Sequence, residues 1–427
     1  MTTIFAQATA PGKAGVSIIR VSGPAAFHAA EMITGHKPRS RAMSLRSFRR
    51  SDGELIDRGL LLSFPGPDSF TGEDSVEFHC HGSAAVIKDL LRELDRIEDL
   101  QPADPGEFTR RALQNDKLDL VQVEALGDLI DAETDLQRRQ AMSLLSGVLS
   151  EKIESWRAIL IKALSLLEAT IDFSDEDVPA EVWKDAGDLV QSVRLEISNI
   201  LSNSMSSDRL RQGYSVVILG PPNAGKSTLI NALSDRDVAI TTPIPGTTRD
   251  IVETALNWHG IPIRLMDTAG LRKSDDEIEI LGVEKAIAAA EMADLRIYLG
   301  EQPDNMVLPS RAQDLIVGAK ADLGRSHGLS VSGLTGEGLA ELREAVAQRL
   351  EVGKLSKQLL LRDRYRNVLS EASENLGAAQ EAIENRLNEE LVSEEIRAAL
   401  FVLDMLIGRV TPDDVLDDVF SSFCIGK

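Results

Sequence analysis

The sequence predicts a multidomain α/β chain in which a compact α+β domain precedes a helical domain that an inserted α/β domain interrupts. Its 427 residues exceed what one hydrophobic core usually supports. Short β-branched runs come first, long stretches of helical periodicity follow, and strands then alternate with helices before helices resume. These changes predict domains over 1–118, 119–208, 209–353 and 354–427, the second and last forming one helical domain.

Each predicted domain has its own local pattern. In the first, the runs VSIIRV, LIDRGLLLSF and SVEFHCH predict strands, and VIKDLLRELDRI predicts a helix. Between 119 and 208, apolar residues such as Leu160, Leu164 and Leu167 recur at helical spacing. From 209 to 353, the apolar runs SVVILG, IRLMD, LRIYL and LIVGA are typical of a parallel sheet.

Composition excludes several classes of protein. No segment contains the roughly eighteen uninterrupted apolar residues of a membrane span, so no membrane association is expected. The first residues resemble neither a signal peptide nor a transit peptide, and the two cysteines, Cys80 and Cys424, make no disulfide framework. A cytoplasmic protein is therefore expected.

The net charge of -22 argues against a chain that grips nucleic acid unaided. The exception is the basic run KPRSRAMSLRSFRR, from Lys37 to Arg50. Such a run could contact phosphates, although it is more often a solvated loop or face. Any contact with RNA is expected to need a partner.

A phosphate-binding loop follows the apolar run that ends at Leu219. Residues Gly220–Ser227 read GPPNAGKS, which fits G-x-x-x-x-G-K-[ST] with a strand before it and a helix after it. Backbone N–H groups of this loop can surround phosphates, Lys226 can place a charge on the outer phosphates, and the Ser227 hydroxyl can ligate Mg²⁺.

Two switch motifs follow in the order expected of a Ras-like GTPase core. Asp267 ends a strand, where it can hold magnesium through water, and Gly270 can offer its N–H to the γ-phosphate. Between the phosphate loop and Asp267, the sequence GTTRD begins at Gly246 and supplies Thr248 as a second magnesium ligand.

The base-recognition motif departs from Asn-Lys-x-Asp because Ala319 replaces the asparagine before Lys320 and Asp322. Asp322 can still accept hydrogen bonds from guanine, but the contact of an asparagine with the base N7 is lost. One missing hydrogen bond costs on the order of 1 kcal/mol, so GTP affinity should fall while specificity persists. Ser332-Gly333 stands where Ser-Ala is usual, and the linker 301–314 leaves little room for a crossover helix.

Four further stretches resemble the MnmE (TrmE) family of tRNA-modifying GTPases. They are FTGEDSVEFHCHG (70–82), PGEFTRRALQNDKLDLVQVEA (105–125), DTAGLRKSDDEIE (267–279) and the terminal FCIGK (423–427). Asp116 replaces a glycine that is usual before Lys117. The resemblance implies an N-terminal folate-binding domain that dimerises, followed by a helical domain interrupted by the GTPase domain.

The resemblance also implies a nucleotide site. Potassium would be bound by Asn223, Thr242, Ile244 and Thr247, where a cation can neutralise charge developing on the phosphates. Glu279 matches the acid that orients the attacking water, a role the residue pattern alone would not suggest. The complete expected GTP site comprises Asn223, Ala224, Gly225, Lys226, Ser227, Thr228, Thr242, Pro243, Ile244, Pro245, Gly246, Thr247, Thr248, Asp267, Thr268, Ala269, Gly270, Ala319, Lys320, Asp322, Ser332 and Gly333.

A folate site is implied at Arg20, Glu77, Lys117 and Lys427, which match the family's tetrahydrofolate contacts. Cationic side chains suit the glutamate carboxylates of a folate, and a carboxylate suits the donor edge of its pterin ring. Spacing alone would make each of these residues a surface charge.

Two cysteine-containing segments leave alternatives open. In a strand, His79 and His81 face away from Phe78 and Cys80, so two imidazoles without further ligands disfavour a zinc site. Cys424 matches a family cysteine for which a chemical role has been proposed, and on physical grounds it is as well explained as a small buried hydrophobe.

The favoured function is that of an enzyme, a potassium-activated GTPase acting in tRNA modification. By resemblance, it forms a homodimer and works with an FAD-containing partner to add an aminomethyl or carboxymethylaminomethyl group to C5 of uridine 34 in tRNA. The one-carbon donor would be 5,10-methylene- or 5-formyl-tetrahydrofolate. A ribosome-associated or assembly GTPase would carry the same core motifs but predicts a basic surface, and a folate-responsive scaffold without nucleotide function is disfavoured by the intact phosphate loop.

Overall fold

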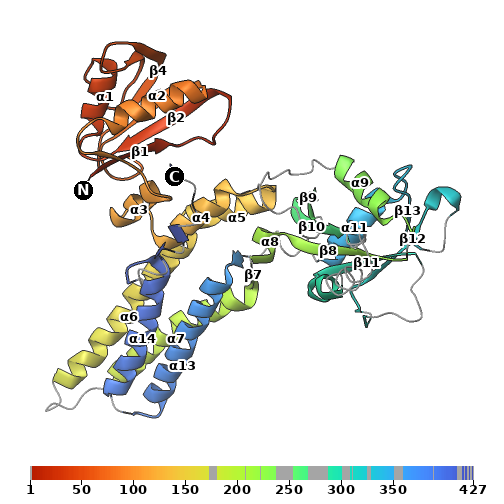
Figure 1. Cartoon of the computed structure of the whole chain (residues 1–427). Helices are drawn as coiled ribbons and strands as arrows, with labels where there is room; N and C mark the ends of the chain where they lie inside the picture. The colour runs from red at the N-terminus through yellow and green to blue at the C-terminus, as the bar shows by residue number, and fades with distance from the viewer. Residues whose placement is uncertain are drawn as a thin grey trace, which may run out of the picture. The chain divides into compact units, whose positions relative to one another are not determined.

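The computed structural model describes the chain in two compact units, which are treated separately below (Figure 1). One unit comprises 1–127, 144–155 and 403–427, and the other comprises 128–143 and 156–402. The described residues are 2–172, 180–206, 208–221, 223–236, 253–267, 287–300, 308–309, 311–324, 328–350, 359–387, 389–410, 416–417, 419–420, 423 and 426.

The first unit is built on a six-stranded sheet with the order β3-β4-β5-β2-β1-β6. All neighbouring strands are antiparallel except β1 and β6. The strands are β1 (Thr3–Gln7), β2 (Ala14–Ser22), β3 (Met43–Arg49), β4 (Leu55–Phe64), β5 (Ser75–Gly82) and β6 (Leu100–Pro102), and the helices are α1 (Ala26–Thr34), α2 (Ala84–Asp95) and α3 (Glu107–Gln114).

Alternation along the strands decides which face of this sheet is covered. Phe78 and Cys80 of β5 are buried in the core that α1 and α2 form on one face, whereas His79 and His81 point to the other face, as predicted. Phe48 of β3 meets Phe78 edge to face, with ring centroids 5.4 Å apart. The predicted α+β domain is therefore confirmed.

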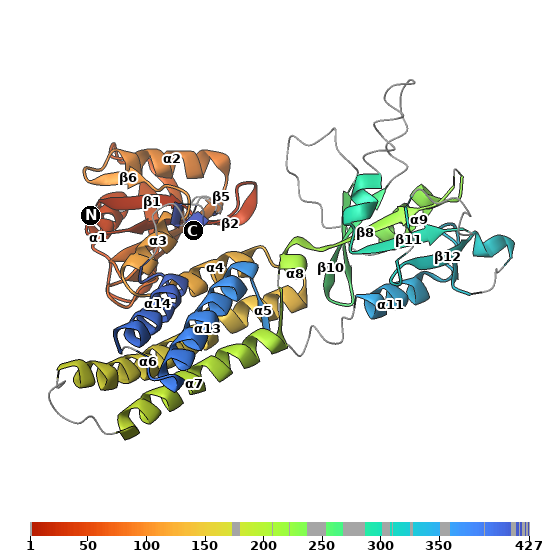
Figure 2. The ribbon, with the colours of Figure 1, turned by 90° about the horizontal axis from the view of Figure 1, so that it is seen from below.

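The helical part is formed by two segments that are distant in sequence. Its helices are α4 (Leu120–Ile130), α5 (Asp135–Leu145), α6 (Val148–Asp172), α7 (Ala180–Asn203), α13 (Asp363–Glu384) and α14 (Glu389–Ile407). A capping box starts α4, because Asp119 Oδ1 accepts from Gln122 N at 2.9 Å and Asp119 N donates to Gln122 Oε1 at 3.0 Å. The helices α7 and α13 lie side by side (Figure 2), joined by Arg194 Nη1 donating to Gln380 Oε1 at 3.0 Å.

Between these helical segments lies a mostly parallel sheet with the order β13-β12-β11-β8-β10-β9. Only the pair β9 and β10 is antiparallel. The elements are α8 (Asp208–Gln212), β8 (Tyr214–Leu219), α9 (Lys226–Arg236), β9 (Glu253–Trp258), β10 (Ile261–Asp267), β11 (Leu295–Leu299), β12 (Leu315–Ala319), the 3₁₀ helix η1 (Ala321–Leu323), β13 (Ser330–Val331) and α11 (Leu339–Arg349). The strands predicted from the apolar runs are confirmed, and so is the multidomain α/β class.

The chain enters and leaves this α/β part at one point. The strands β7 (Ser204–Ser206) and β14 (Leu359–Leu361) pair in parallel, and Arg366 Nη1 donates to the carbonyl and hydroxyl oxygens of Ser204 at 2.8 and 2.6 Å. Sequence patterns did not reveal this pair. The pairing supports the predicted insertion, whose exact limits stay a prediction.

No described helix is long and apolar enough to cross a membrane.

A buried ion pair fixes the connection between β11 and β12, where the sequence predicted a shortened linker. The Arg296 guanidinium donates to both carboxylate oxygens of Asp314 at 2.9 and 2.7 Å and to Pro309 O at 2.8 Å. The Arg296 and Asp314 side chains are only 1% and 3% exposed, and Asp314 also accepts from Arg311 N at 2.8 Å. This pair therefore anchors the described end of the linker to β11, beside the buried Leu308.

Removing one partner of this ion pair should destabilise the α/β part strongly. We expect Arg296→Ala to lower its free energy of unfolding by about 3–5 kcal/mol, because a carboxylate stays buried without its cation. Hydrogen exchange of peptides from β8 and β11 across a urea series measures this loss. The double variant Arg296→Met/Asp314→Leu should recover most of it, and equal stability of Arg296→Ala and the wild type would contradict the prediction.

Candidate functional site

The phosphate loop connects β8 to α9 at the carboxyl edge of the parallel sheet. Asn223 and Gly225 adopt the left-handed region with φ of 61° and 95°, which turns the loop back over the start of α9. Lys226 Nζ donates to the carbonyl oxygens of Gly220 and Pro221 at 2.8 and 2.9 Å. The Lys226 ammonium group therefore lies against the backbone of the phosphate loop, on the concave side where phosphates are expected to bind.

The strand β10 ends with Asp267 at the same edge of the sheet. In the parallel pairing of β10 with β8, Asp267 lies opposite Ile218, two residues before Gly220. Parallel pairing therefore brings the end of β10 beside the phosphate loop, as the sequence analysis expected.

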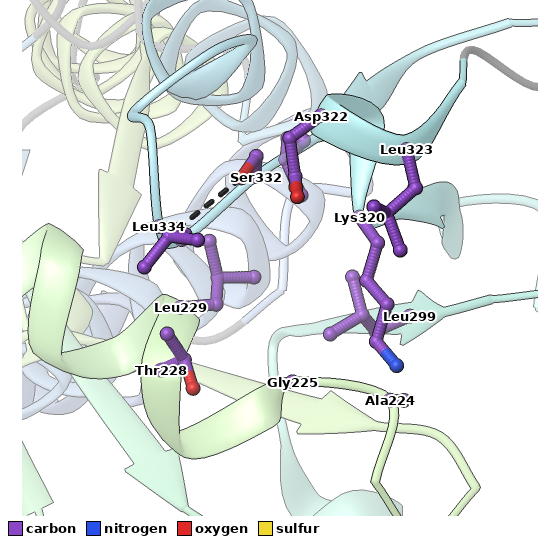
Figure 3. A pocket seen from close by; sticks show the side chains of 12 residues that line it. Ala224, Gly225, Thr228, Leu229, Leu299, Lys320, Asp322, Leu323, Ser332 and Leu334 are labelled. Carbon is purple, nitrogen blue, oxygen red and sulfur yellow. Dashed lines mark hydrogen bonds between the residues drawn. The ribbon is translucent and has the colours of Figure 1, made fainter.

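A cavity of about 330 Å³ opens beside the phosphate loop (Figure 3), a volume within the range of small-ligand sites. Lys320 adopts φ of 56°, which starts η1 and places Lys320 and Asp322 on one wall. The predicted residues that line it are Ala224, Gly225, Thr228, Lys320, Asp322, Ser332 and Gly333.

The loop after β13 forms the wall opposite η1. The Ser332 hydroxyl accepts from Leu334 N and Thr335 N, each at 3.2 Å, so it holds its own turn. A Cβ atom at Gly333 would lie 2.7–2.8 Å from the backbone of Thr228. Glycine in place of the usual alanine therefore lets this loop approach α9 more closely.

Sequence reasoning missed the apolar lining of this cavity. Leu323 and Leu334 line the cavity although each is 80% exposed, and Leu299 lines it from β11. The cavity thus combines one carboxylate and one ammonium group with apolar side chains, which suits a flat heterocycle with a polar edge. Only the positions of Leu323 directly after Asp322 and of Leu334 directly after Gly333 hinted at this role.

Two more predicted residues are described: Ser227 lies in the first turn of α9, and Ala319 ends β12. The other members of the predicted nucleotide site fall outside the described residues, as do two predicted residues near the C-terminus. They are Thr242, Pro243, Ile244, Pro245, Gly246, Thr247, Thr248, Thr268, Ala269, Gly270, Glu279, Cys424 and Lys427.

A second cluster lies on the open face of the N-terminal sheet, where antiparallel register places Arg20 of β2 opposite Glu77 of β5. Arg20 Nε and Nη2 lie 3.0 and 2.9 Å from Glu77 Oε1, and His79 Nε2 lies 3.1 Å from Glu77 Oε2. The Arg20 guanidinium also lies 5.4 and 5.7 Å from the ring centroids of Phe70 and Phe108. The cluster therefore presents charged and aromatic groups together.

Two further chain segments approach this region. A Cβ at Gly72 would lie 3.1 Å from Lys117 Cε, so the predicted Lys117 reaches the loop that carries Phe70. Gly426 is in contact with Gln7 of β1, because a Cβ there would lie 2.0 Å from Gln7 O. The C-terminal end of the chain therefore packs against this domain.

No group of three or more His, Cys, Asp or Glu side chains suited to a metal ion occurs in the described part of the chain.

Comparison with known proteins places the chain in a family. The TrmE N-terminus family of GTP-binding proteins matches residues 3–117, and the MnmE helical-domain family matches residues 120–424. The tRNA modification GTPase MnmE of Dinoroseobacter shibae is 47% identical over the full length of both chains. The chain belongs to the MnmE family of tRNA modification GTPases. The corresponding proteins of Roseobacter denitrificans and Cereibacter sphaeroides are 45% and 46% identical over the same full lengths. The family and enzyme class predicted from the sequence are thus confirmed.

The presence of Ala319 in place of the usual asparagine leads to a prediction about the affinity for the guanine base. Wild type should bind 7-deaza-GDP, which lacks the N7 acceptor, as tightly as GDP, because the Ala319 methyl group donates nothing to N7. Ala319→Asn should bind GDP about fivefold more tightly, the effect of roughly 1 kcal/mol, without that gain for 7-deaza-GDP. Calorimetric titration measures both affinities. Ala319→Leu is the control of similar volume, and a fivefold preference of wild type for GDP would contradict the prediction.

Burial makes the thiol of Cys80 unreactive. Burial, with the nearby charge of Asp57, raises the pKa of Cys80 to about 11, so only about one thiol in a thousand is ionised at pH 8. We expect the native Cys424→Ser variant to show no fast reaction with Ellman's reagent at pH 8, and one reactive thiol after unfolding in guanidinium. A fast thiol in that native variant would contradict the burial of Cys80.

Proposed function

We propose that this MnmE family member hydrolyses GTP and uses the resulting conformational cycle to modify uridine 34 of tRNA at C5. It acts with an FAD-containing partner protein and a tetrahydrofolate one-carbon donor, either 5,10-methylene- or 5-formyl-tetrahydrofolate. The product is an aminomethyl or carboxymethylaminomethyl group on the base, and the reaction takes place in the cytoplasm. The observation that carries the proposal is the presence, in one chain, of the nucleotide cavity and the Arg20–Glu77 cluster.

The nucleotide cavity suits GTP hydrolysis. Asp322 accepts hydrogen bonds from the guanine edge, and the leucines of the cavity cover the apolar faces of the base. Lys226, whose ammonium group contacts the loop carbonyls, would contact the outer phosphates, and Ser227 and Thr248 would hold Mg²⁺, with Asp267 acting through water. Asn223, Thr242, Ile244 and Thr247 would hold potassium, and Glu279 would orient the attacking water. Both cations would supply positive charge to neutralise the charge that develops on the phosphates.

The Arg20–Glu77 cluster suits a folate. The Glu77 carboxylate, held by Arg20, accepts from the donor edge of the pterin ring, and Lys117 and Lys427 supply cations for the glutamate carboxylates at the other end of the folate. Phe70, which is 38% exposed, lies beside Arg20 and offers an aromatic face to a flat ring, whereas Phe108, which also lies beside Arg20, is fully buried. The contact of Gly426 with Gln7 supports a role for Lys427, the next residue in the sequence.

An apolar patch supports homodimerisation through the N-terminal domain. Met43 and Leu45 of β3 are 66% and 52% exposed and pair with Leu62 and Leu60 of β4. By strand register, these four side chains share the sheet face that carries Glu77. A second copy that covers this face would remove apolar surface from water beside the folate site.

Folate binding tests the N-terminal half of the proposal. We expect 5-formyl-tetrahydrofolate to bind wild type and to bind Glu77→Gln at least tenfold more weakly, because a charge-assisted hydrogen bond contributes about 1.5–3 kcal/mol. Calorimetry measures both, and Glu98→Gln is the exposed control of equal charge change. Equal affinity for all three proteins would show that Glu77 does not bind the folate.

Potassium dependence tests the GTPase half. Steady-state hydrolysis of GTP should exceed that of ATP, be faster in potassium than in sodium at equal ionic strength, and fall in Asn223→Ala. The physical reason is that the Asn223 side chain supplies an oxygen ligand to a cation that stabilises the transition state. Turnover that is indifferent to the cation would reject the potassium site and leave an ordinary GTPase switch.

A further inference from the structure

The edge strand of the N-terminal sheet carries a positive surface in a strongly acidic chain. Residues 37–64, which contain β3 and β4, have seven Lys and Arg against three Asp and Glu, a net charge of +4, whereas the whole chain carries -22. The strand β3 is the terminal strand of the described sheet, so its outer edge has no neighbouring strand there. Cations are therefore concentrated along an accessible edge.

Most of these cations have no carboxylate to neutralise them. Arg41 pairs with Asp68, and Arg50 pairs with Glu54 and Asp89. The other five have no ion pair with any described residue, and all but the half-buried Arg46 are exposed. We name these five the β3 strip: Lys37, Arg39, Arg46, Arg49 and Arg58.

The backbone holds the β3 strip in a defined arrangement. Arg58 of β4 lies opposite Ser47 of β3, so strand alternation puts Arg49 and Arg58 on one face of the sheet edge and Arg46 on the other face, with Phe48. Arg39 lies in the loop before β3, where its carbonyl oxygen accepts from the Ser63 hydroxyl of β4. The seven residues of β3 extend over about 20 Å, which is long enough for several phosphates of a nucleic-acid strand.

The chemistry of the strip favours phosphate groups. Four of its five members are arginines, whose planar guanidinium groups match phosphate oxygens in pairs. Uncompensated cations on a sheet edge create a local positive potential that attracts a polyanion even when the net charge is negative. Among polyanions, RNA is the one that a tRNA modification enzyme must bind.

We propose that the β3 strip binds the phosphate backbone of tRNA. This inference rests on the proposed function, since it names the surface through which the tRNA substrate is held. The strip positions tRNA without reading its sequence, because contacts to phosphates carry no base information. The N-terminal domain thereby binds both the nucleic acid and the one-carbon donor.

The test compares two variants of equal net charge in the full-length chain. The strip variant is Arg39→Ala/Arg46→Ala/Arg49→Ala, and its matched control is Lys152→Ala/Lys162→Ala/Lys184→Ala, which removes three exposed cations from α6 and α7. Filter binding of bulk tRNA over a salt series gives the affinity and its salt dependence. GTP hydrolysis and circular dichroism of each variant serve as folding controls, because none of the six residues belongs to the nucleotide site.

We expect the strip variant to lose roughly tenfold or more in tRNA affinity at about 50 mM salt. Its slope of log affinity against log salt should be shallower by about two to three, one for each phosphate contact removed. The control should behave as wild type, and both variants should retain GTP hydrolysis. This combination would support the proposal.

Other outcomes overturn it. Equal affinity and slope for the strip variant and wild type would reject the strip while leaving the tRNA assignment intact. Failure of wild type itself to bind tRNA would reject both the strip and the proposed tRNA step. If the substitutions instead abolish binding to vesicles containing phosphatidylserine, or self-association in sedimentation, with tRNA binding unchanged, the strip serves a lipid surface or a second copy.

Discussion

Parallel strand pairing is the constraint on which the nucleotide site depends. Because β8, β10, β11 and β12 run in one direction, their carboxyl ends meet at one edge of the sheet. The phosphate loop, Asp267 and the turn that carries Asp322 each follow one of these ends. The buried pair of Arg296 with Asp314 lies at the amino ends of β11 and β12, so it stabilises the same sheet from the edge opposite the cavity.

In the N-terminal domain, the antiparallel register decides which side chains come together. Arg20 and Glu77 lie directly opposite each other, and a slip of one residue would send one of them into the core that contains Phe78. The core on one face therefore dictates which charges appear on the other. The same alternation places Met43 and Leu45 on the face of Glu77, so apolar and charged groups are neighbours there.

The local distribution of charge, rather than the net charge, decides where the chain can attract a polyanion. A chain with a net charge of -22 repels polyanions, but screening at physiological salt limits that repulsion to a range of about 8 Å. A local excess of arginines on a sheet edge can then dominate the field near it. An acidic composition is thus compatible with a local cationic surface at the β3 edge of the sheet, an arrangement that total charge would not suggest.

The sequence by itself determined the family and the strands β2, β4, β5, β8, β10, β11 and β12. It also predicted the order of the domains and the motif residues from Gly220 to Asp322, because strand alternation and loop chemistry are local. Only the tertiary structure brought β7 to β14, Gly426 to Gln7 and Arg296 to Asp314, and only it turned Leu323 and Leu334 into cavity lining. These contacts join segments whose local patterns carry no information about their partners. Their pairing depends on how the connecting chain closes, which is a property of the whole fold.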